Sequence, residues 1–240
     1  MDLKESSLLG EKIDGHWYYT TKAMAVSKVL GDFSPNIILD VGAGSGFFSK
    51  YLLRSTTAKS AHCIDIGYPE DFERKYAGKN IFFARSVDRI GADLILMMDV
   101  LEHVDDDLEL LIKYVKMSPR GAKFLITVPA FEFMWSDHDV FLDHKRRYTL
   151  NQLKKVVNNS GLQINYLSYY FSIIFPIAFI VRMFSKLRSK LSKSSLAKVS
   201  SQSSFINKLL TILCEFELRF MKYNNVGGLT VICLAEKLSH

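Results

Sequence analysis

A short glycine-rich segment, IILDVGAGSGFF over residues 37–48, constrains the fold more than any other part of the sequence. An apolar run typical of a buried strand is followed directly by Gly42, Gly44 and Gly46, and then by a stretch expected to be helical. Glycine lets the backbone turn tightly and pass close to a ligand, because it has no Cβ. The helix that follows presents unpaired N–H groups to a polar or anionic ligand. The segment therefore predicts a ligand-binding turn between a strand and a helix.

The apolar runs around this turn predict a mostly parallel sheet. Short strand-like runs alternate with helix-like stretches, which is typical of an α/β fold with helices on both faces. Such a sheet binds ligands at the carboxyl ends of its strands. The expected strands are Ile37–Val41, Ala61–Ile66, Ile81–Ala84, Asp93–Met98, Gly121–Val128, Leu162–Tyr170 and Gly228–Ala235. The expected helices are Gly46–Arg54, Pro69–Tyr76, one beginning at Asp105–Asp107, Thr149–Ser160 and Phe205–Tyr223.

This pattern divides the 240 residues into three parts. Residues 1–35 are expected to form a helical cap or lid, residues 36–170 and 224–240 the core, and residues 171–223 a helical insert. The three cysteines form no CxxC pair, which argues against a zinc ribbon and against a disulfide framework. The first residues lack the apolar core of a secretory signal, so a cytoplasmic location is expected.

The acidic residue before the glycines selects among cofactors. Asp40 precedes Gly42 by two positions, and the glycine spacing is GxGxG rather than the GxGxxG of dinucleotide-binding proteins. A carboxylate at this position would repel a pyrophosphate, but it suits the ammonium group of an amino acid. The segment therefore favours S-adenosylmethionine over NAD.

Further cofactor contacts are expected at the ends of the next strands. Asp65 ends the second strand, where a carboxylate can accept hydrogen bonds from both ribose hydroxyls. Ser86 and Val87, after the third strand, are expected to flank the adenine. The residues after the fourth strand that are expected near the adenine or the methionine are Asp99, Val100 and Leu101.

On these residues the sequence resembles the class I S-adenosylmethionine-dependent methyltransferases. ILDVGAGSGFFS resembles the first motif of that family, Asp65 matches its ribose-binding position, and DLILMMDVLEHVDDD resembles the fourth-strand motif of its ubiquinone-biosynthesis-like branch (methyltransferase types 11 and 12). The resemblance implies a seven-stranded Rossmann-like sheet whose last strand is antiparallel, with the insert before that strand. It also implies S-adenosyl-L-homocysteine as the product of the cofactor.

A narrower resemblance concerns the segments HWYYTTKAMAVSKVL and VPAFEFMWSDHDVFLDHKRRYTLNQLKKVVNNSGLQI. They resemble bacterial methyltransferases encoded with surface-glycan and lipid-linked sugar pathways. The favoured function is O-methylation of a small molecule or of a lipid-linked glycan precursor. Two alternatives stay open: a non-catalytic, membrane-associated module that binds the cofactor, and a nucleotide-sugar or NAD-dependent enzyme.

Methyl transfer is an in-line displacement, so the enzyme mainly positions the acceptor, and a general base helps a hydroxyl nucleophile. Glu102 and His103 together with Asp137, Asp139 or one of the later histidines could form a metal site, but nothing in the spacing demands one, so no metal is expected. The candidate bases are His103, His138 and His144. The candidate substrate contacts are Trp17 and Tyr18 in the lid, and Trp135, Arg146, Arg147 and Tyr148.

The insert combines an apolar segment with basic residues. No Asp or Glu occurs from Arg182 through Cys214, and the uncharged run before Arg182 is too short to span a bilayer. Residues 171–198 are therefore expected to bind an anionic membrane surface, at the inner face, as a peripheral anchor. A helical pair that caps the sheet or forms a homodimer interface is an equal alternative. No nucleic-acid partner is expected, because the sequence shows no basic motif interleaved with aromatic residues.

Overall fold

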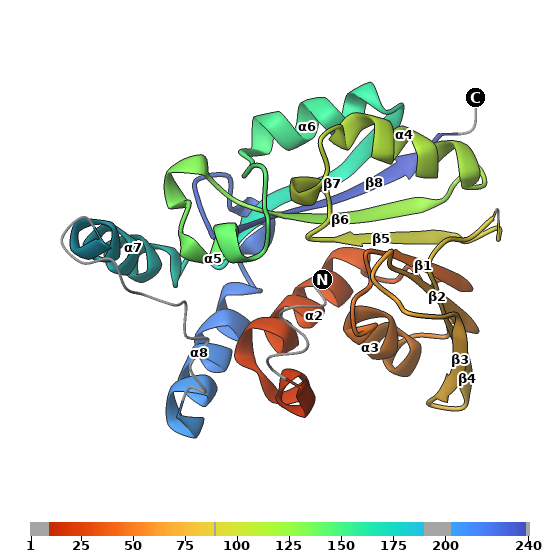
Figure 1. The fold of residues 1–240 in the computed structure, drawn as a ribbon, viewed down its shortest axis with the longest axis horizontal. Helices are drawn as coiled ribbons and strands as arrows, with labels where there is room; N and C mark the ends of the chain where they lie inside the picture. The colour runs from red at the N-terminus through yellow and green to blue at the C-terminus, as the bar shows by residue number, and fades with distance from the viewer. Residues whose placement is uncertain (1–9, 89, 190–202, 239–240) are drawn as a thin grey trace.

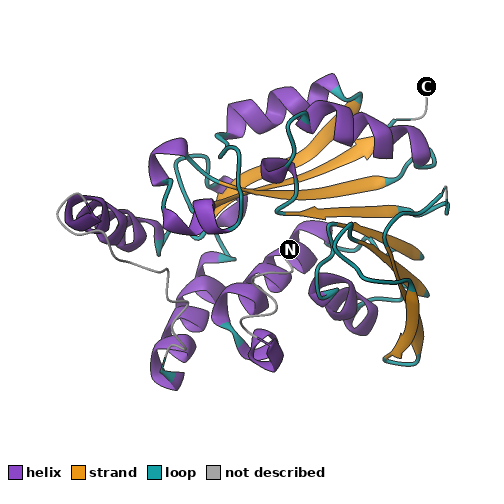
Figure 2. Cartoon of the chain, in the orientation of Figure 1, coloured by secondary structure: helices purple, strands orange, loops and turns teal. Residues whose placement is uncertain are grey.

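The computed structural model describes residues 10–88, 90–189 and 203–238, and these residues contain one mixed sheet of eight strands in the order β3-β4-β2-β1-β5-β6-β8-β7. Helices cover both faces of this sheet (Figures 1 and 2). The α/β class expected from the sequence is confirmed. The strands are β1 Ile37–Val41, β2 Ser60–Ile64, β3 Phe72–Tyr76, β4 Lys79–Ala84, β5 Leu94–Met98, β6 Lys123–Pro129, β7 Leu162–Tyr170 and β8 Thr230–Lys237.

The centre of the sheet is parallel and apolar. Strand β1 pairs in parallel with β2 on one side and with β5 on the other, and β4 and β6 extend the parallel part outward. The chain therefore proceeds outward from β1 in one direction and then crosses to β5 to proceed in the other. Open sheets of this type form a ligand crevice beyond the carboxyl ends of the two strands at such a switch point. In this chain that position lies above Val41 and Met98.

Two layers of helices bury the two faces. Helices α2 (Trp17–Leu30) and α3 (Phe47–Ser55) lie on one side, and α4 (Asp107–Met117) and α6 (Leu150–Asn159) lie on the other (Figure 1). Leu52 of α3 belongs to the apolar cluster on the α2 and α3 side of the sheet, and Leu111 of α4 belongs to the apolar cluster on the α4 and α6 side. Because both faces are covered, the central strands are apolar on both sides, as the continuous apolar runs predicted.

The expected helix over Pro69–Tyr76 is wrong. Residues Phe72–Tyr76 instead form β3, which pairs antiparallel with β4 and adds an eighth strand to the expected seven. The hairpin turn consists of Ala77 and Gly78, whose φ angles of 50° and 77° match the left-handed turn that two-residue hairpins prefer. The ring of Phe72 stacks on Phe83 at 4.5 Å, which fixes the register. The segment Phe72–Tyr76 is mostly polar, and its apolar residues follow neither the helical nor the strand periodicity. Its structure therefore depends on the turn and on this cross-strand pair.

The expected terminal hairpin and its insert are confirmed. Strand β8 runs antiparallel to both β6 and β7, and α7 (Phe175–Ser189) and α8 (Ser204–Glu217) lie between β7 and β8 in the chain. Helix α8 ends at Glu217, before a separate 3-10 turn at Met221–Tyr223, so it is shorter than expected. Within the described part of the chain, no helix has the length and apolar character that crossing a bilayer requires. The expected division into lid, core and insert stays a prediction.

The start of α6 gives a test of the fold. Thr149 accepts a hydrogen bond from the N–H of Gln152, and the Gln152 side chain accepts one from the N–H of Thr149, which is a capping box. We expect Thr149→Ala to lower the free energy of unfolding by about 1 kcal/mol, measured by urea denaturation, because the cap is lost. Thr149→Ser keeps the hydroxyl and should stay close to wild type. Equal stability of the two variants would contradict this role.

Candidate active site

The glycine turn lies at the carboxyl end of β1, facing the end of β5. Gly42, Gly44 and Gly46 have φ angles of 64°, 55° and 70°, in the left-handed region that favours glycine. A Cβ on Gly42 would lie 2.8 Å from Cγ2 of Val100, and one on Gly46 would lie 3.0 Å from the Phe83 ring. Both contacts are closer than carbon atoms normally approach. The turn therefore needs glycine for its backbone angles and also for its contact with the residues after β5 and on β4.

Asp40 lies beneath this turn rather than on its open side. Its side chain is buried, and its Oδ2 accepts a hydrogen bond of 2.8 Å from the hydroxyl of Ser49 on α3. Burial raises the pKa of Asp40 from 3.8 to about 6, and the hydrogen bond from Ser49 offsets only part of this effect. Asp40 therefore joins β1 to α3 and supplies a carboxylate whose charge is costly until a cation approaches.

Asp65 closes the other side of the turn. Its Oδ2 accepts a hydrogen bond of 3.0 Å from the N–H of Gly44, and its Oδ1 accepts one of 2.9 Å from the N–H of Gly67. Tyr68 donates from its hydroxyl to the carbonyl of Gly44 at 2.6 Å. The carboxylate is half-buried beside the glycines, a position consistent with its predicted contact with a ribose. After β4, Ser86 is exposed and Val87 is half-buried at the same edge of the sheet.

Lys22 is the contact at this site that the sequence analysis missed. Its ammonium group is fully buried and forms an ion pair with Asp99, which also accepts a hydrogen bond of 3.0 Å from the Thr127 hydroxyl. Burial lowers the pKa of Lys22, but the charge and hydrogen bond of Asp99 together with those of Tyr18 outweigh it, so the net pKa is raised above its usual range. The same pair holds the pKa of Asp99 below its usual range, against the effect of burial. The sequence signal that could have identified Lys22 is its position as the only charged residue in the segment TTKAMAV, residues 20–26.

Through this ion pair, α2 covers the carboxyl edge of the sheet. The ring of Tyr19 lies 5.7 Å from that of Phe47, at the start of α3 beside the glycine turn. Trp17 and Tyr18, the predicted lid residues, pack their rings against Phe171 at 5.7 Å and 5.1 Å. These contacts place α2 over the crevice. The role of Trp17 and Tyr18 in binding an acceptor stays a prediction.

The side chains of the crevice fit an S-adenosylmethionine cofactor. The glycines admit a close ligand, Asp65 can receive ribose hydroxyls, and the Asp99 side chain keeps 24 % of its surface exposed. Asp40 is buried and bound by Ser49, so its expected contact with an ammonium group stays a prediction. Among the described residues, the buried hydroxyl oxygen of Ser45, within the turn, has no hydrogen-bond partner. An unsatisfied hydroxyl there is consistent with a bond to a ligand. Val100 and Leu101 are buried, so their backbone and the carboxylate of Asp99 would be the available contacts after β5.

Two of the three candidate histidines lie together. His103 ends the 3-10 turn Leu101–His103 after β5, and its ring lies 4.7 Å from the ring of His144, nearly perpendicular to it. The N–H of Lys145 donates to the carbonyl of Glu102 at 2.7 Å, which ties the His144 loop to this turn. His138 lies on α5 (Asp137–Phe141), in the same region, but it does not contribute a ligand atom to the Glu102, His103 and His144 cluster.

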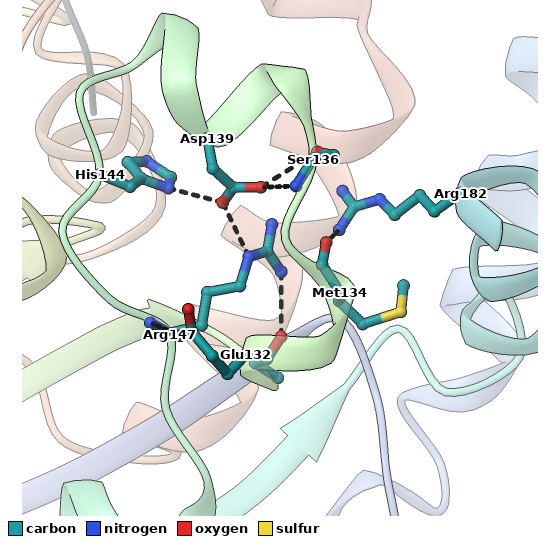
Figure 3. A network of polar contacts seen from close by, with 8 residues as sticks. Glu132, Met134, Ser136, Asp139, His144, Arg147 and Arg182 are labelled. Carbon is teal, nitrogen blue, oxygen red and sulfur yellow. Dashed lines mark hydrogen bonds and ion pairs between the residues drawn. The ribbon is translucent and has the colours of Figure 1, made fainter. Parts of the chain in front are cut away.

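The loop after β6 is organised around Asp139 (Figure 3). The Asp139 Oδ1 accepts a hydrogen bond of 2.9 Å from Nδ1 of His144 and one of 2.7 Å from Nε of Arg147, while Oδ2 accepts from the N–H of Ser136 at 2.8 Å. Burial alone would raise the pKa of Asp139, but these hydrogen bonds hold it below its usual range. Asp139, a residue that the sequence analysis named only as a possible metal ligand, therefore positions the predicted base His144.

The predicted substrate contacts in this loop have structural partners. The Arg147 guanidinium is buried and also donates to the carbonyl of Ala130 at 2.9 Å. Arg146 donates to the carbonyls of Val104 and Asp105 at 2.9 Å and 2.7 Å, and the hydroxyl of Tyr148 donates to Asp107 at 2.7 Å. Trp135 is half-buried after the 3-10 turn Glu132–Met134. These bonds shape the loop, and the contacts of these side chains with an acceptor stay predictions.

The burial of Asp40 predicts a pH dependence of stability. The unfolded chain loses this proton near pH 4 and the folded protein near pH 6, so the Asp40 contribution falls as the pH rises through this interval, by up to about 3 kcal/mol. Asp40→Asn removes the charge and keeps an acceptor for Ser49. In cofactor-free protein, we expect its unfolding free energy, measured in urea from pH 4 to 7, to exceed that of wild type by an amount that grows with pH. Asp32→Asn, at an exposed carboxylate, is the control, and a constant difference for Asp40→Asn would refute the effect.

Comparisons with known proteins agree with this geometry. Solved structures of the same fold include the Haloferax volcanii complex of the Trm112 methyltransferase activator with a proposed methyltransferase (12 % identity, TM-score 0.58, 99 % of this chain and 95 % of that one). An S-adenosylmethionine-dependent methyltransferase from Thermotoga maritima is similar at 14 % identity (TM-score 0.56, covering 98 % and 95 %). A Haemonchus contortus phosphoethanolamine N-methyltransferase, bound to phosphomonomethylethanolamine and S-adenosylhomocysteine, has 15 % identity (TM-score 0.53), and the match covers 91 % of this chain and 53 % of that one.

Among curated protein sequences, none matches this chain. The sequence model of the methyltransferase domain, in contrast, matches residues 16–167, which include α2, the glycine turn, the strand ends of the crevice and the His144 loop. The chain therefore belongs to the methyltransferase domain family and is a class I S-adenosylmethionine-dependent methyltransferase.

Proposed function

We propose that this methyltransferase transfers the methyl group of S-adenosylmethionine to an oxygen atom of a small molecule or of a lipid-linked glycan precursor. The observation that carries the proposal is the position of His103 and His144 beside the end of β5. The glycine turn and Asp99 form the cofactor side of the same crevice. A hydroxyl acceptor must lose a proton during transfer, and imidazole is the side chain best suited to accept it near neutral pH.

The bound cofactor supplies an activated methyl group on a positively charged sulfur. The chain itself mainly has to hold the acceptor oxygen in line with that methyl group, at about 3–3.5 Å. Asp139 fixes the ring of His144 by accepting a hydrogen bond from Nδ1, so Nε2 is the nitrogen of the neutral imidazole that can accept a proton. Asp139 is in turn held by Arg147 and Ser136. Asp139 is therefore a positioning residue, and His144 is the proposed base.

The insert supports a lipid-linked acceptor and a location at the inner face of an anionic membrane. Helices α7 and α8 extend away from the sheet (Figure 1). Arg182 of α7 donates to the carbonyl of Met134, so the insert is attached to the loop that carries Asp139. The basic residues from 190 to 198 lie outside the described residues. Large apolar side chains that are exposed on the two helices are Ile177, Phe179, Ile180, Val181, Met183, Phe184, Phe205, Ile206, Leu209, Ile212 and Phe216.

The function is tested by separating cofactor binding from methyl transfer. We expect calorimetry to show S-adenosylmethionine binding to wild type, and His144→Gln to keep that affinity while label transfer from methyl-labelled cofactor to membrane-extracted acceptors falls by about 10²-fold. Gly42→Ala should weaken cofactor binding by about tenfold or more, because its Cβ would meet Val100. Gly15→Ala is the matched control, since a Cβ there would have no neighbour within 4 Å.

Absence of cofactor binding in folded wild type at millimolar concentration would reject the proposal. Cofactor binding without transfer to any extracted fraction would instead favour the alternative of a non-catalytic binding module. Label in the aqueous fraction rather than the organic one would favour a small-molecule acceptor over a lipid-linked one.

Membrane association is tested by flotation with vesicles. Each basic residue near an anionic surface contributes about 1 kcal/mol, so Lys186→Gln, Arg188→Gln and Lys190→Gln together should weaken binding to phosphatidylglycerol-containing vesicles by about 10²-fold. The control carries the same number of neutralised lysines at Lys75, Lys154 and Lys155, which are exposed on β3 and α6. Vesicles of phosphatidylcholine alone should bind neither protein tightly. Equal flotation of the two triple variants would exclude electrostatic anchoring by the insert.

A further inference from the structure

Three side chains with metal-binding atoms meet at the acceptor side of the crevice. Glu102 and His103 lie in the 3-10 turn after β5, and His144 approaches from the loop after α5. One ligand atom from each of the three lies within 4.8 Å of the other two. Ligand atoms about 2.1 Å from a tetrahedral zinc ion lie about 3.4 Å from one another, so side-chain rotations that bring these atoms up to about 1.4 Å closer together would close the cluster on an ion.

Within the described part of the chain, Glu102 is a buried acidic residue for which no other side chain provides a partner. Its side chain is fully buried, and among the described residues neither carboxylate oxygen has a hydrogen-bond partner. Burial, together with the nearby charge of Asp99, raises the pKa of Glu102 well above its usual range. A buried carboxylate without a partner is costly, and such groups are normally paired or coordinate metals. Asp99 does not serve as its partner, because no hydrogen bond joins the two side chains and the Asp99 carboxylate is bound by Lys22 and Thr127.

The surroundings of His144 have the arrangement expected around a metal-binding histidine. Its Nδ1 lies 2.9 Å from Oδ1 of Asp139, which leaves Nε2 as the ligand atom. A carboxylate commonly accepts the other ring N–H of such a histidine and fixes the orientation of its ring. Asp139 is fully buried and is itself fixed by Arg147 and Ser136. The His144 ring is therefore pre-positioned by a buried network (Figure 3) rather than by a mobile surface contact.

We propose that Glu102, His103 and His144 bind a divalent transition-metal ion, for which Zn²⁺ is the representative. Two imidazoles and one carboxylate are the protein ligands of several catalytic zinc sites, which keep an open position for water or substrate. The sequence analysis weighed Glu102 and His103 with a later histidine but expected no metal, because nothing in the spacing demands one; the fold brings Glu102 and His103 next to His144.

The catalytic role of this ion rests on the proposed function. The cluster lies at the end of β5, next to Asp99 on the cofactor side of the crevice. An open metal position there would bind the acceptor oxygen and lower the pKa of its hydroxyl, as metals do for bound water. His144 would then hold the ion through Nε2 instead of accepting the proton directly, and the hydroxyl, with its pKa lowered by the metal, would lose its proton to solvent. This role replaces the base role given to His144 above and leaves the methyl transfer itself unchanged.

Metal content tests the site without reference to turnover. Full-length protein is stripped with a chelator, dialysed against Zn²⁺, passed through a desalting column and analysed by inductively coupled plasma mass spectrometry. We expect about one ion per chain in wild type, and a loss of at least tenfold in affinity in Glu102→Gln and in His144→Gln. Asp139→Asn should weaken binding by about 10–100-fold. His62→Gln is the control, because His62 lies on β2 outside the cluster and stacks on Phe82.

A second measurement covers variants that fold poorly. Glu102→Gln removes a buried, unpaired carboxylate, so in metal-free protein its thermal midpoint should equal or exceed that of wild type, while Zn²⁺ should raise the midpoint of wild type alone. Less than about a tenth of an ion per chain in folded wild type, or equal Zn²⁺ binding by wild type and Glu102→Gln, would overturn the proposal. Calorimetry with S-adenosylmethionine separates the two hypotheses: cofactor binding without metal binding rejects only the metal site, and the reverse result rejects only the proposed function.

Discussion

The ion pair between Lys22 and Asp99 joins the N-terminal helix to the centre of the sheet, and the geometry of the crevice depends on it. Lys22 is fully buried, so its charge needs the carboxylate, and Asp99 stands at the point where β5 ends with a left-handed φ of 56°. The pair holds α2 over the strand ends. Residues 16–30 thereby become one wall of the cofactor crevice, although they precede the first strand in the chain.

A second carboxylate, Asp139, fixes the loop on the acceptor side of the crevice. By accepting bonds from His144, Arg147 and Ser136, it converts an irregular loop after β6 into a fixed wall. The loop reaches the turn after β5 through the bond between Lys145 and Glu102, and it reaches the insert through Arg182. Burial and the nearby charge of Arg147 lower the pKa of Arg182 to about 10. The cofactor turn, the histidines and the insert are therefore connected by a few buried polar contacts.

Much of the core could be predicted because it depends on local patterns. The strand around Asp40, the glycine turn and the capped helix after Thr149 each follow from residue types at short spacing, and the structure has them where they were expected. The polar segment Phe72–Tyr76 could not be predicted in this way. Its strand depends on the pairing of Phe72 with Phe83 across a turn, and helical propensity is a weak guide when such pairing is available.

The sequence by itself determined the family and most of the sheet, and it predicted which residues hold the cofactor, because a glycine turn flanked by carboxylates carries its chemistry within a few residues. Only the tertiary structure decided which polar side chains meet. It buried Lys22 against Asp99, placed Asp139 behind His144, and left Glu102 buried beside two imidazoles. Lys22 and Asp99, like Glu102 and His144, come from separate elements of the chain, whereas Asp139 and His144 are five positions apart and are brought together by the fold of one loop. Their contact is set by how the helices and loops pack on the sheet, and no spacing in the sequence encodes that packing.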